Sequence, residues 1–264
     1  MYTNQGMSIK EIGKYFNVSN TPISRVLHAN NAVKKADVGR YNAIYQINHN
    51  LFDIIDTEDK AWLIGFIASD GHVSKNNSII FTQSEKQLDA LQHVKRIFES
   101  DAKIKIKHIR GKHKETIAYS FSITSTYIAN RLRMMGLNNQ KSNGYDFEKL
   151  KSYIPNALMP HFLRGLFDGD GSIKYYKYPY FKKVNVHVGF THTKDAVDFW
   201  WEYFKLGTKI VKETEKIFTA VTANRFKAEE IYHILYDDAH TYLKIKKDTF
   251  DEFLLKFHED ETKM

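Results

Sequence analysis

The chain has 264 residues, of which 42% are hydrophobic and 27% charged, a composition ordinary for a globular protein with a substantial core. Its net charge is +8; the segment Asp251–Met264 holds five acids and two lysines, so residues 1–250 carry about +11. A basic body favours a polyanionic partner, most commonly nucleic acid, over a surface that is merely basic. The absence of cysteine excludes disulfides, thiolate zinc sites and a cysteine nucleophile.

No segment has the pattern of a membrane span or a secretory leader. Residues 1–6 lack a basic region followed by an apolar stretch. No apolar run approaches the roughly 18 residues that a membrane-spanning helix needs. We therefore expect an intracellular protein, in the cytoplasm or in a phage-infected host, with no membrane partner.

Residues 1–30 have the pattern of two short helices around a tight turn. The run Ser8-Ile-Lys-Glu11 is typical of a capping box, and Asn17 tolerates the left-handed backbone of a sharp turn. We expect Phe16 and Val26 on the inner face between the helices. The pattern resembles a helix-turn-helix, with an incidental helix pair as the alternative. The residues left facing outward are predicted to contact DNA: Asn20, Thr21, Ser24 and Arg25.

Residues 31–52 are predicted to be a basic linker. Apolar periodicity fades there, while Lys34, Lys35 and Arg40 add to a net charge of +4 over residues 1–50. An extended arm along DNA phosphates and a solvated spacer explain this composition equally well.

The most informative feature is a motif that occurs twice, a hundred residues apart. The first copy is Leu63-Ile-Gly-Phe-Ile-Ala-Ser-Asp70-Gly71, and the second is Leu163-Arg-Gly-Leu-Phe-Asp-Gly-Asp170-Gly171. Each is an apolar helical run with a central glycine and an Asp-Gly end. A single Asp-Gly is a common turn signal, whereas two copies with the same glycine offset indicate two similar modules.

The flanks of both motifs predict the same order of elements. In the first module the helix ending at Asp70 begins at Asp56 or Thr57. It is followed by strand Ile79–Thr82, helix Leu88–Ile97, strands Lys103–His108 and Thr116–Thr124, and helix Tyr127–Met135. The second module repeats this with strand Val184–Thr191, a helix at Val197–Phe204, strands Lys209–Val211 and Ile217–Thr222, and helix Ala228–Tyr236.

We therefore expect an α+β fold of two pseudo-symmetric αββαββα modules, preceded by a small all-α unit. The predicted domains are a helix-turn-helix at 1–30, a linker at 31–52, modules at 53–150 and 151–258, and an acidic tail at 259–264.

The paired motifs also predict a chemistry. Gly65 and Gly165 would let the two helices pack closely, so that Asp70 and Asp170 meet where the helices end. Two adjacent carboxylates need cations, because like charges close together raise one pKa strongly. Hard oxygen ligands suit Mg²⁺ (or Mn²⁺), which can activate water and stabilise the leaving oxygen of a phosphodiester. The sequence thus favours a metal-dependent nuclease.

The two motifs, including the run Pro160–Ser172, resemble the double motif of single-chain LAGLIDADG homing endonucleases. The resemblance covers about residues 53–257, and the upstream unit resembles modules appended to some of these enzymes. It implies that the motif helices form the interface of two halves and that two antiparallel sheets form a DNA-binding saddle. It further implies metal ligation by Asp70 and Asp170, helped by the carbonyls of Ser69 and Gly169.

One position departs from this pattern. Ala68 stands in the first copy where Asp168 stands in the second, so the halves are chemically unequal. We expect Asp168 to cap the helix or bind a backbone amide rather than to act in catalysis.

The resemblance also implies polar groups around the metal site. Lys141 and Lys246 correspond to the lysine positions of the two halves, although Lys244 and Lys247 compete with Lys246 for the register. A lysine near the scissile phosphate would stabilise developing negative charge, with a plain phosphate contact as the alternative. Gln83 and His192 occupy matching strand ends, where orienting water and ordinary hydrogen bonding are equal alternatives.

The DNA-reading surface is expected on the strands. Lys103, Lys105 and Lys107 alternate, so they should project from one face of a strand. A solvated charged face is the alternative. The full predicted set in the two modules is Lys103, Lys105, Lys107, Arg110, Lys112, Lys174, Lys177, Lys182 and Lys183.

These observations favour a monomeric, Mg²⁺-dependent, site-specific endonuclease of double-stranded DNA. The resemblance implies a long asymmetric site, cleavage of both strands across the minor groove and 3′ overhangs. No splicing-domain sequence surrounds the modules, so we expect an enzyme of intron mobility or a free-standing one rather than an intein. The alternatives are an RNA maturase, with its own intron RNA as partner, and a non-cleaving transcription regulator.

Overall fold

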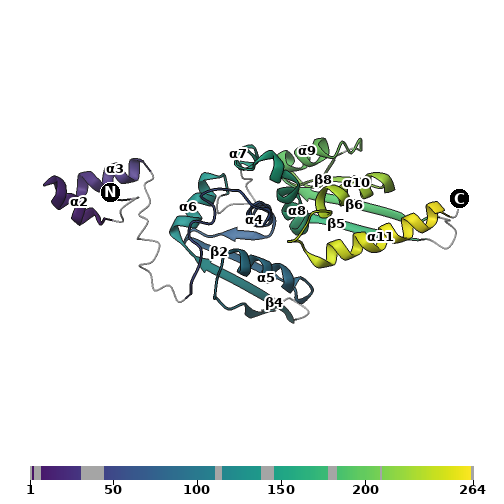
Figure 1. Ribbon diagram of the computed structural model, residues 1–264, viewed down its shortest axis with the longest axis horizontal. Helices are drawn as coiled ribbons and strands as arrows, with labels where there is room; N and C mark the ends of the chain where they lie inside the picture. Colours follow the sequence, from purple (N-terminus) through teal and green to yellow (C-terminus); the bar gives the residue numbers. More distant parts are fainter. Residues whose placement is uncertain are drawn as a thin grey trace.

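The computed structural model describes residues 2, 7–30, 45–110, 115–137, 146–177, 183–208 and 210–262, without the side chains of His28 and Arg110. Two helix-and-sheet modules follow an N-terminal helix pair, and their central helices α4 and α8 lie side by side (Figure 1). The predicted α+β fold with two modules is confirmed.

The N-terminal pair consists of α2 (Ile9–Phe16) and α3 (Asn20–Ala29). The capping box is present, since Ser8 Oγ accepts from the amide of Glu11 at 3.1 Å and the Glu11 carboxylate accepts from the amide of Ser8 at 2.6 Å. Asn17 adopts the left-handed backbone, with φ 53°. The expected burial of Phe16 and Val26 is wrong: they are 58% and 61% exposed. Two short helices alone bury little surface, and Ile12 is their one buried large apolar side chain within the described residues.

The first module packs helices against one face of a four-stranded antiparallel sheet of order β1-β2-β4-β3. Thr57 caps α4, its hydroxyl accepting from the amide of Lys60. The elements are α4 (Glu58–Ser69), β1 (Gly71–Val73), β2 (Ser78–Gln83), η2 (Glu85–Gln87), α5 (Leu88–Ile97), β3 (Lys105–Arg110), β4 (Glu115–Thr124) and α6 (Thr126–Met134).

The second module has the same topology, with sheet order β5-β6-β8-β7. Its elements are α8 (Met159–Asp170), β5 (Gly171–Tyr176), β6 (Asn185–His192), α9 (Lys194–Tyr203), β7 (Val211–Lys212), β8 (Phe218–Thr222) and α10 (Arg225–Tyr236). The short helices α7 (Phe147–Ser152) and η4 (Asn156–Leu158) precede α8. The hairpin β5–β6 is longer than β1–β2.

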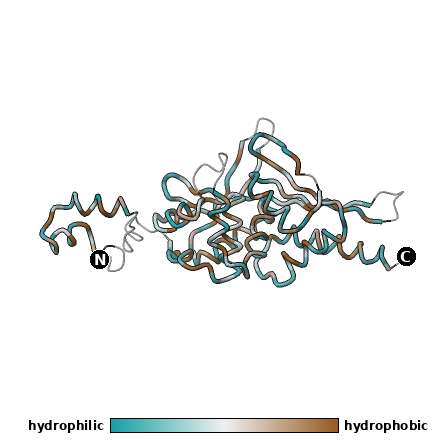
Figure 2. The backbone as a smooth tube through the Cα atoms, turned by 90° about the horizontal axis from the view of Figure 1, so that it is seen from above, coloured by the Kyte–Doolittle hydropathy of each residue, from teal (hydrophilic) through white to brown (hydrophobic). Residues whose placement is uncertain are grey.

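A final helix, α11 (Lys244–Thr262), was not predicted from the sequence. It runs along β5 (Figure 1) and alternates between hydrophilic and hydrophobic segments (Figure 2). Phe250, Phe253, Leu254 and Phe257 are buried at the spacing of one helical face. This periodicity was present in the sequence, but the density of acids around it suggested a tail instead.

The crossing of α4 and α8 depends on two glycines. A Cβ on Gly65 would lie 2.2 Å from the carbonyl oxygen of Phe162, and one on Gly165 would lie 2.1 Å from that of Trp62. Each helix therefore presses a bare Cα against the backbone of the other, and the contact is reciprocal. This packing brings the C-terminal ends of both helices together. No helix of the described residues is long and apolar enough to cross a membrane.

We predict that Gly65→Ala destabilises the protein by about 1–3 kcal/mol or more, because the new methyl must push one backbone away from the other. Helix propensity alone predicts the opposite sign, a gain of about 1 kcal/mol. Urea unfolding followed by circular dichroism measures the change.

Gly189→Ala is the matched control, since its methyl would meet the movable hydroxyl of Ser172 at 3.0 Å. It should change stability far less. A Gly65→Ala protein as stable as the parent would contradict the close crossing.

Candidate functional site

Asp70 and Asp170 lie where the crossed helices end. Asp70 is the C-cap of α4, and Asp170 is the last residue of α8. A Cβ on Gly169 would lie 3.3 Å from the carboxyl carbon of Asp70, so this carboxylate packs against the chain immediately before Asp170. The two acidic helix ends thus meet, as the repeated motif predicted.

A polar side chain from the end of a strand faces each aspartate. Gln83, the last residue of β2, donates from Nε2 to Asp70 Oδ2 at 2.7 Å. His192, the last residue of β6, places Nε2 3.4 Å from Asp170 Oδ2. Both side chains are buried. The predicted pair therefore occupies equivalent positions in the two modules, with an amide in one and an imidazole in the other.

The hydrogen bonds of His192 assign its tautomer. The amide of Thr193 donates to Nδ1 at 2.7 Å, so Nδ1 is an acceptor and the neutral ring carries its proton on Nε2. That N–H faces the Asp170 carboxylate.

Ser69 and Gly169 occupy the motif position just before each aspartate. Ser69 Oγ donates to the carbonyl of Gly65 at 3.1 Å. A Cβ added at Gly169 would lie only 2.0 Å from this hydroxyl oxygen and would clash with it. The serine of one helix therefore requires a glycine in the other. This contact keeps the segments before both aspartates close together.

Of the three candidate lysines at the start of α11, Lys246 is the one whose side chain reaches the end of α8. Lys246 Nζ donates to the carbonyl of Phe167 and, at 2.6 Å, to that of Gly171, which places the ammonium at the C-terminal end of α8. Lys244 instead pairs with Asp248, and Lys247 with Asp251.

Burial lowers the pKa of Lys246 to about 8, although the negative charges of Asp168, Asp70 and Asp170 oppose the shift. Because this pKa lies close to neutral pH, the protonation of the Lys246 amine is sensitive to any charge that binds nearby. Its position also complements the negative end of the α8 dipole.

The donor set fits a hard divalent cation. Asp70 and Asp170 supply carboxylate oxygens, and the carbonyls of Ser69 and Gly169 lie beside them in the chain. Among the described residues, no cluster of three or more histidine, aspartate or glutamate side chains forms a closed cage. Mg²⁺ commonly uses one or two carboxylates and completes its shell with water and substrate phosphates, so two carboxylates suffice.

Asp168 is fully buried and has a structural role. It accepts hydrogen bonds from Trp62 Nε1 at 2.8 Å, the Tyr236 hydroxyl at 2.9 Å and the amide of Leu243 at 2.9 Å. Burial raises its pKa, while the charge of Lys246 and these donors oppose the shift. The prediction that Asp168 binds a backbone amide is confirmed.

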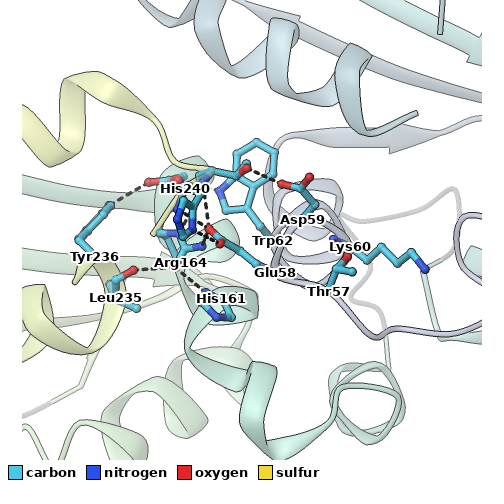
Figure 3. A network of polar contacts seen from close by, with 12 residues as sticks. Thr57, Glu58, Asp59, Lys60, Trp62, His161, Arg164, Leu235, Tyr236 and His240 are labelled. Carbon is cyan, nitrogen blue, oxygen red and sulfur yellow. Dashed lines mark hydrogen bonds and ion pairs between the residues drawn. The ribbon is translucent and has the colours of Figure 1, made fainter. Parts of the chain in front are cut away.

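A charged network around Glu58 and Arg164 links the two modules (Figure 3). Arg164 in α8 is 1% exposed and donates from Nη2 to Glu58 Oε1 in α4 at 2.5 Å. Its other donors bind the carbonyls of Leu235 at 2.7 Å and Thr241 at 2.8 Å. Glu58 Oε1 also accepts the amides of His240 at 2.7 Å and Thr241 at 2.9 Å.

A second pair extends this network. Arg96 in α5 forms two bonds to Asp59, at 2.6 and 2.8 Å, and donates to the Thr241 hydroxyl at 2.7 Å. That hydroxyl in turn donates to Asp59. We call Glu58, Asp59, Arg96, Arg164 and Thr241 the inter-module clasp.

The clasp was not predicted from the sequence, where Glu58 and Asp59 are simply acids near the start of a helix. Arg164 carried the available signal, because an arginine inside an otherwise apolar, buried helix needs a buried partner. Which partner it finds depends on residues more than 70 positions away on either side.

The predicted DNA-contacting residues have varied surroundings. Lys105 and Lys107 pair with Ser120 and Ala118 on β4, so they share one face of β3 and are exposed. Lys103 precedes β3, so the prediction that it projects from the same strand face is wrong. Lys174 lies exposed on β5.

The two lysines that flank the connection between β5 and β6 are paired with α11. Lys177 contacts Asp260 at 2.7 Å, and Lys183 contacts Glu261 at 3.2 Å. The acidic end of α11 thus lies against two residues predicted to bind DNA. In α3, Asn20, Thr21 and Arg25 are exposed and Ser24 is half-buried.

The remaining predicted residues lie outside the described part of the chain: Lys34, Lys35, Arg40, Lys112, Lys141 and Lys182, together with the side chain of Arg110.

The clasp carboxylates predict a loss of stability in acid. Burial alone would raise the pKa of Glu58, but the amides of Thr241 and His240 and the charge of Arg164 outweigh it, so the pKa is lowered. A carboxylate with a lowered native pKa stabilises the fold above its unfolded pKa, and this contribution is lost as the pH falls through the native pKa.

We therefore expect Glu58→Gln to be less stable by about 3 kcal/mol near neutral pH, because it leaves Arg164 buried without its counter-charge. Its stability should also fall less than that of the parent between about pH 7 and pH 3. Urea unfolding across this range tests both. Glu230→Gln, which removes an exposed partner of Lys227, is the control and should change stability by less than about 1 kcal/mol. If the stability of Glu58→Gln fell as steeply in acid as that of the parent, the role assigned to Glu58 would be refuted.

Comparisons with known proteins agree with this architecture. A family model described as a LAGLIDADG-like domain matches residues 57–153. The homing endonuclease I-WcaI, solved bound to its DNA recognition sequence, superposes with a TM-score of 0.54 at 18% identity, covering 74% of this chain and 87% of that one. The I-LtrWI homing endonuclease, solved bound to target DNA, gives 0.51 at 14% identity, over 82% of this chain and 92% of that one.

A curated relative matches part of the same region. The replication factor C small subunit of Methanocaldococcus jannaschii is 28% identical over 168 residues, which is 59% of this chain and 9% of that protein. This chain therefore corresponds to a small part of that relative. Residues 57–153 therefore match a LAGLIDADG-like domain, and the chain shares its two-sheet fold with solved LAGLIDADG homing endonucleases.

Proposed function

We propose that the protein is a divalent-metal-dependent, site-specific endonuclease of double-stranded DNA, a homing endonuclease. The observation that carries the proposal is the meeting of Asp70 and Asp170 at the ends of two helices that cross through Gly65 and Gly165. A protein that only bound DNA would have no need for two adjacent acids in a basic body. The relatives solved with DNA support the same function.

The two aspartates would hold the metal, with the carbonyls of Ser69 and Gly169 as further oxygen ligands. A divalent metal held there would lower the pKa of a bound water and neutralise charge on the phosphate. Gln83 and His192 support this arrangement from the strand ends. Each can donate a hydrogen bond to its aspartate, which orients the carboxylate.

Lys246 is the residue proposed to meet the scissile phosphate on its side of the site. Its ammonium lies at the end of α8, within the electrostatic reach of both aspartates. A cation held beside a phosphate stabilises the charge that develops on the phosphate oxygens in the transition state. Lys141 is proposed for the equivalent role in the other half.

The open faces of the two sheets are proposed to read DNA. Lys105 and Lys107 project from β3, and Lys174 projects from β5, so both sheets present cations. The two sheets carry different side chains, and their hairpins differ in length. Because the two halves would therefore contact different base pairs, the proposed DNA recognition site is long and asymmetric. Cleavage across the minor groove with 3′ overhangs and a monomeric enzyme belong to the same proposal.

We expect Asp70→Asn and Asp170→Asn each to reduce double-strand cleavage by about 100-fold or more, because each removes a metal-binding charge. The target is first obtained by selecting cleaved duplexes from randomised DNA with Mg²⁺. Rates are then measured on the selected duplex with Mg²⁺, with Mn²⁺ and with EDTA.

Binding of the same duplex by the variants is the control, and it should stay within a few-fold of the parent. Cutting by both variants would refute the site. A parent protein that binds DNA or intron RNA tightly but cuts no DNA would favour the regulator or the maturase instead.

We expect Lys105→Ala combined with Lys107→Ala to weaken DNA binding and to lower the slope of log affinity against log salt by about two, one for each phosphate that a lysine no longer neutralises. Fluorescence anisotropy at several salt concentrations measures the slope. Lys227→Ala in α10, which removes a lysine already paired with Glu230, is the control. An unchanged slope would show that this row does not contact phosphates.

A further inference from the structure

Among the residues that the structure describes, the inter-module clasp is found on one side of the pseudo-twofold axis. At the motif offset of one hundred residues, Arg164 corresponds to Ile64, Glu58 to Leu158 and Asp168 to Ala68. None of these counterparts can form an ion pair. The charged side chains of the clasp, and Asp168, all bind the same segment, the loop between α10 and α11.

This loop, residues 237–243, is fixed mainly through its backbone. Glu58 accepts the amides of His240 and Thr241, Arg164 donates to the carbonyl of Thr241, and Asp168 accepts the amide of Leu243. Asp89 of the first module accepts the next amide, that of Lys244, at 2.9 Å. Such contacts fix the path of the chain whatever side chains it carries.

The loop leads directly into the lysine of the site. Lys246 lies in the first turn of α11, and its amide donates to the carbonyl of Leu243, the last residue of the loop, at 3.0 Å. Its ammonium then reaches the carbonyls of Phe167 and Gly171 at the end of α8. A displacement of the loop must therefore move the ammonium relative to Asp170.

We infer that Glu58 of the first module is a positioning residue for Lys246 of the second module. Glu58 lies at the opposite end of α4 from Asp70 and does not itself reach the acidic pair; it acts by holding the loop that delivers the lysine. The inference rests on the proposed function for its catalytic consequence, because Lys246 is there assigned to one of two scissile phosphates.

The one-sidedness of the clasp predicts an unequal effect on the two DNA strands. Loosening the loop displaces Lys246 but leaves Gln83 and both aspartates on their own elements. Cleavage of the strand next to Lys246 should slow by about 10–100-fold, the cost of a misplacement of about 1 Å. The other strand should be cut at nearly the parental rate, so a nicked duplex accumulates.

The first experiment measures the two strand-cleavage rates of Glu58→Gln in single turnover. The probe is the duplex selected by the parent protein, with a different fluorophore on each strand, at a temperature where circular dichroism shows each protein folded. Glu230→Gln is the matched control and should keep the parental ratio of rates. Equal slowing of both strands, or an unchanged ratio, would overturn the inference.

A second variant covers the case in which Glu58→Gln does not fold. Thr241→Val keeps the volume and the backbone contacts of the loop but removes the hydroxyl that binds Arg96 and Asp59. It should shift the ratio of rates in the same direction by a smaller factor. No shift in a folded Thr241→Val protein would count against the inference.

A second measurement needs no DNA cleavage. Reductive methylation followed by peptide mass spectrometry reports the reactivity of individual lysines in the full chain. Lys246 should be protected in the parent and several-fold more reactive in Glu58→Gln, whereas the exposed Lys244 should react alike in both. A parent that cuts no DNA would defeat the proposed function, while unchanged protection of Lys246 would defeat the positioning role.

Discussion

The crossing of α4 and α8 is the constraint on which the rest of the structure depends. Gly65 and Gly165 each leave space for the backbone of the partner helix, at distances where a methyl group could not fit. Because both helices then end together, their C-terminal aspartates are neighbours, and each sheet starts directly from a helix end. A change at either glycine would separate the modules and the two carboxylates at once.

The halves that meet at this crossing are related but not equivalent. Gln83 faces Asp70, whereas His192 faces Asp170. The clasp and the buried Asp168 tie only the second module's loop to the first module. The two modules thus keep the symmetric pair of acids, the paired glycines and the sheet order, while the side chains that face the acids differ.

Much of the fold could be predicted because its signals are local. Helical and strand periodicities located most elements to within a few residues, and the equal offsets from glycine to aspartate located the acidic pair. The errors arose where packing overrode pattern. Phe16 and Val26 have the spacing of an inner face, but two short helices offer too little surface to cover them. The charges around α11 obscured an apolar stripe that packs on β5.

The sequence by itself determined the duplicated motif, the α+β class and the two aspartates, since these follow from spacing within short segments. Only the tertiary structure decided that Lys246, rather than Lys244 or Lys247, reaches the carbonyls at the end of α8. It also decided that Arg164 and Glu58 join the modules. Both decisions depend on how α11 and its preceding loop are docked against α4 and α8. That docking is set by hydrogen bonds and ion pairs between residues up to 183 positions apart. Such partners cannot be predicted from the pattern of residues within one short segment.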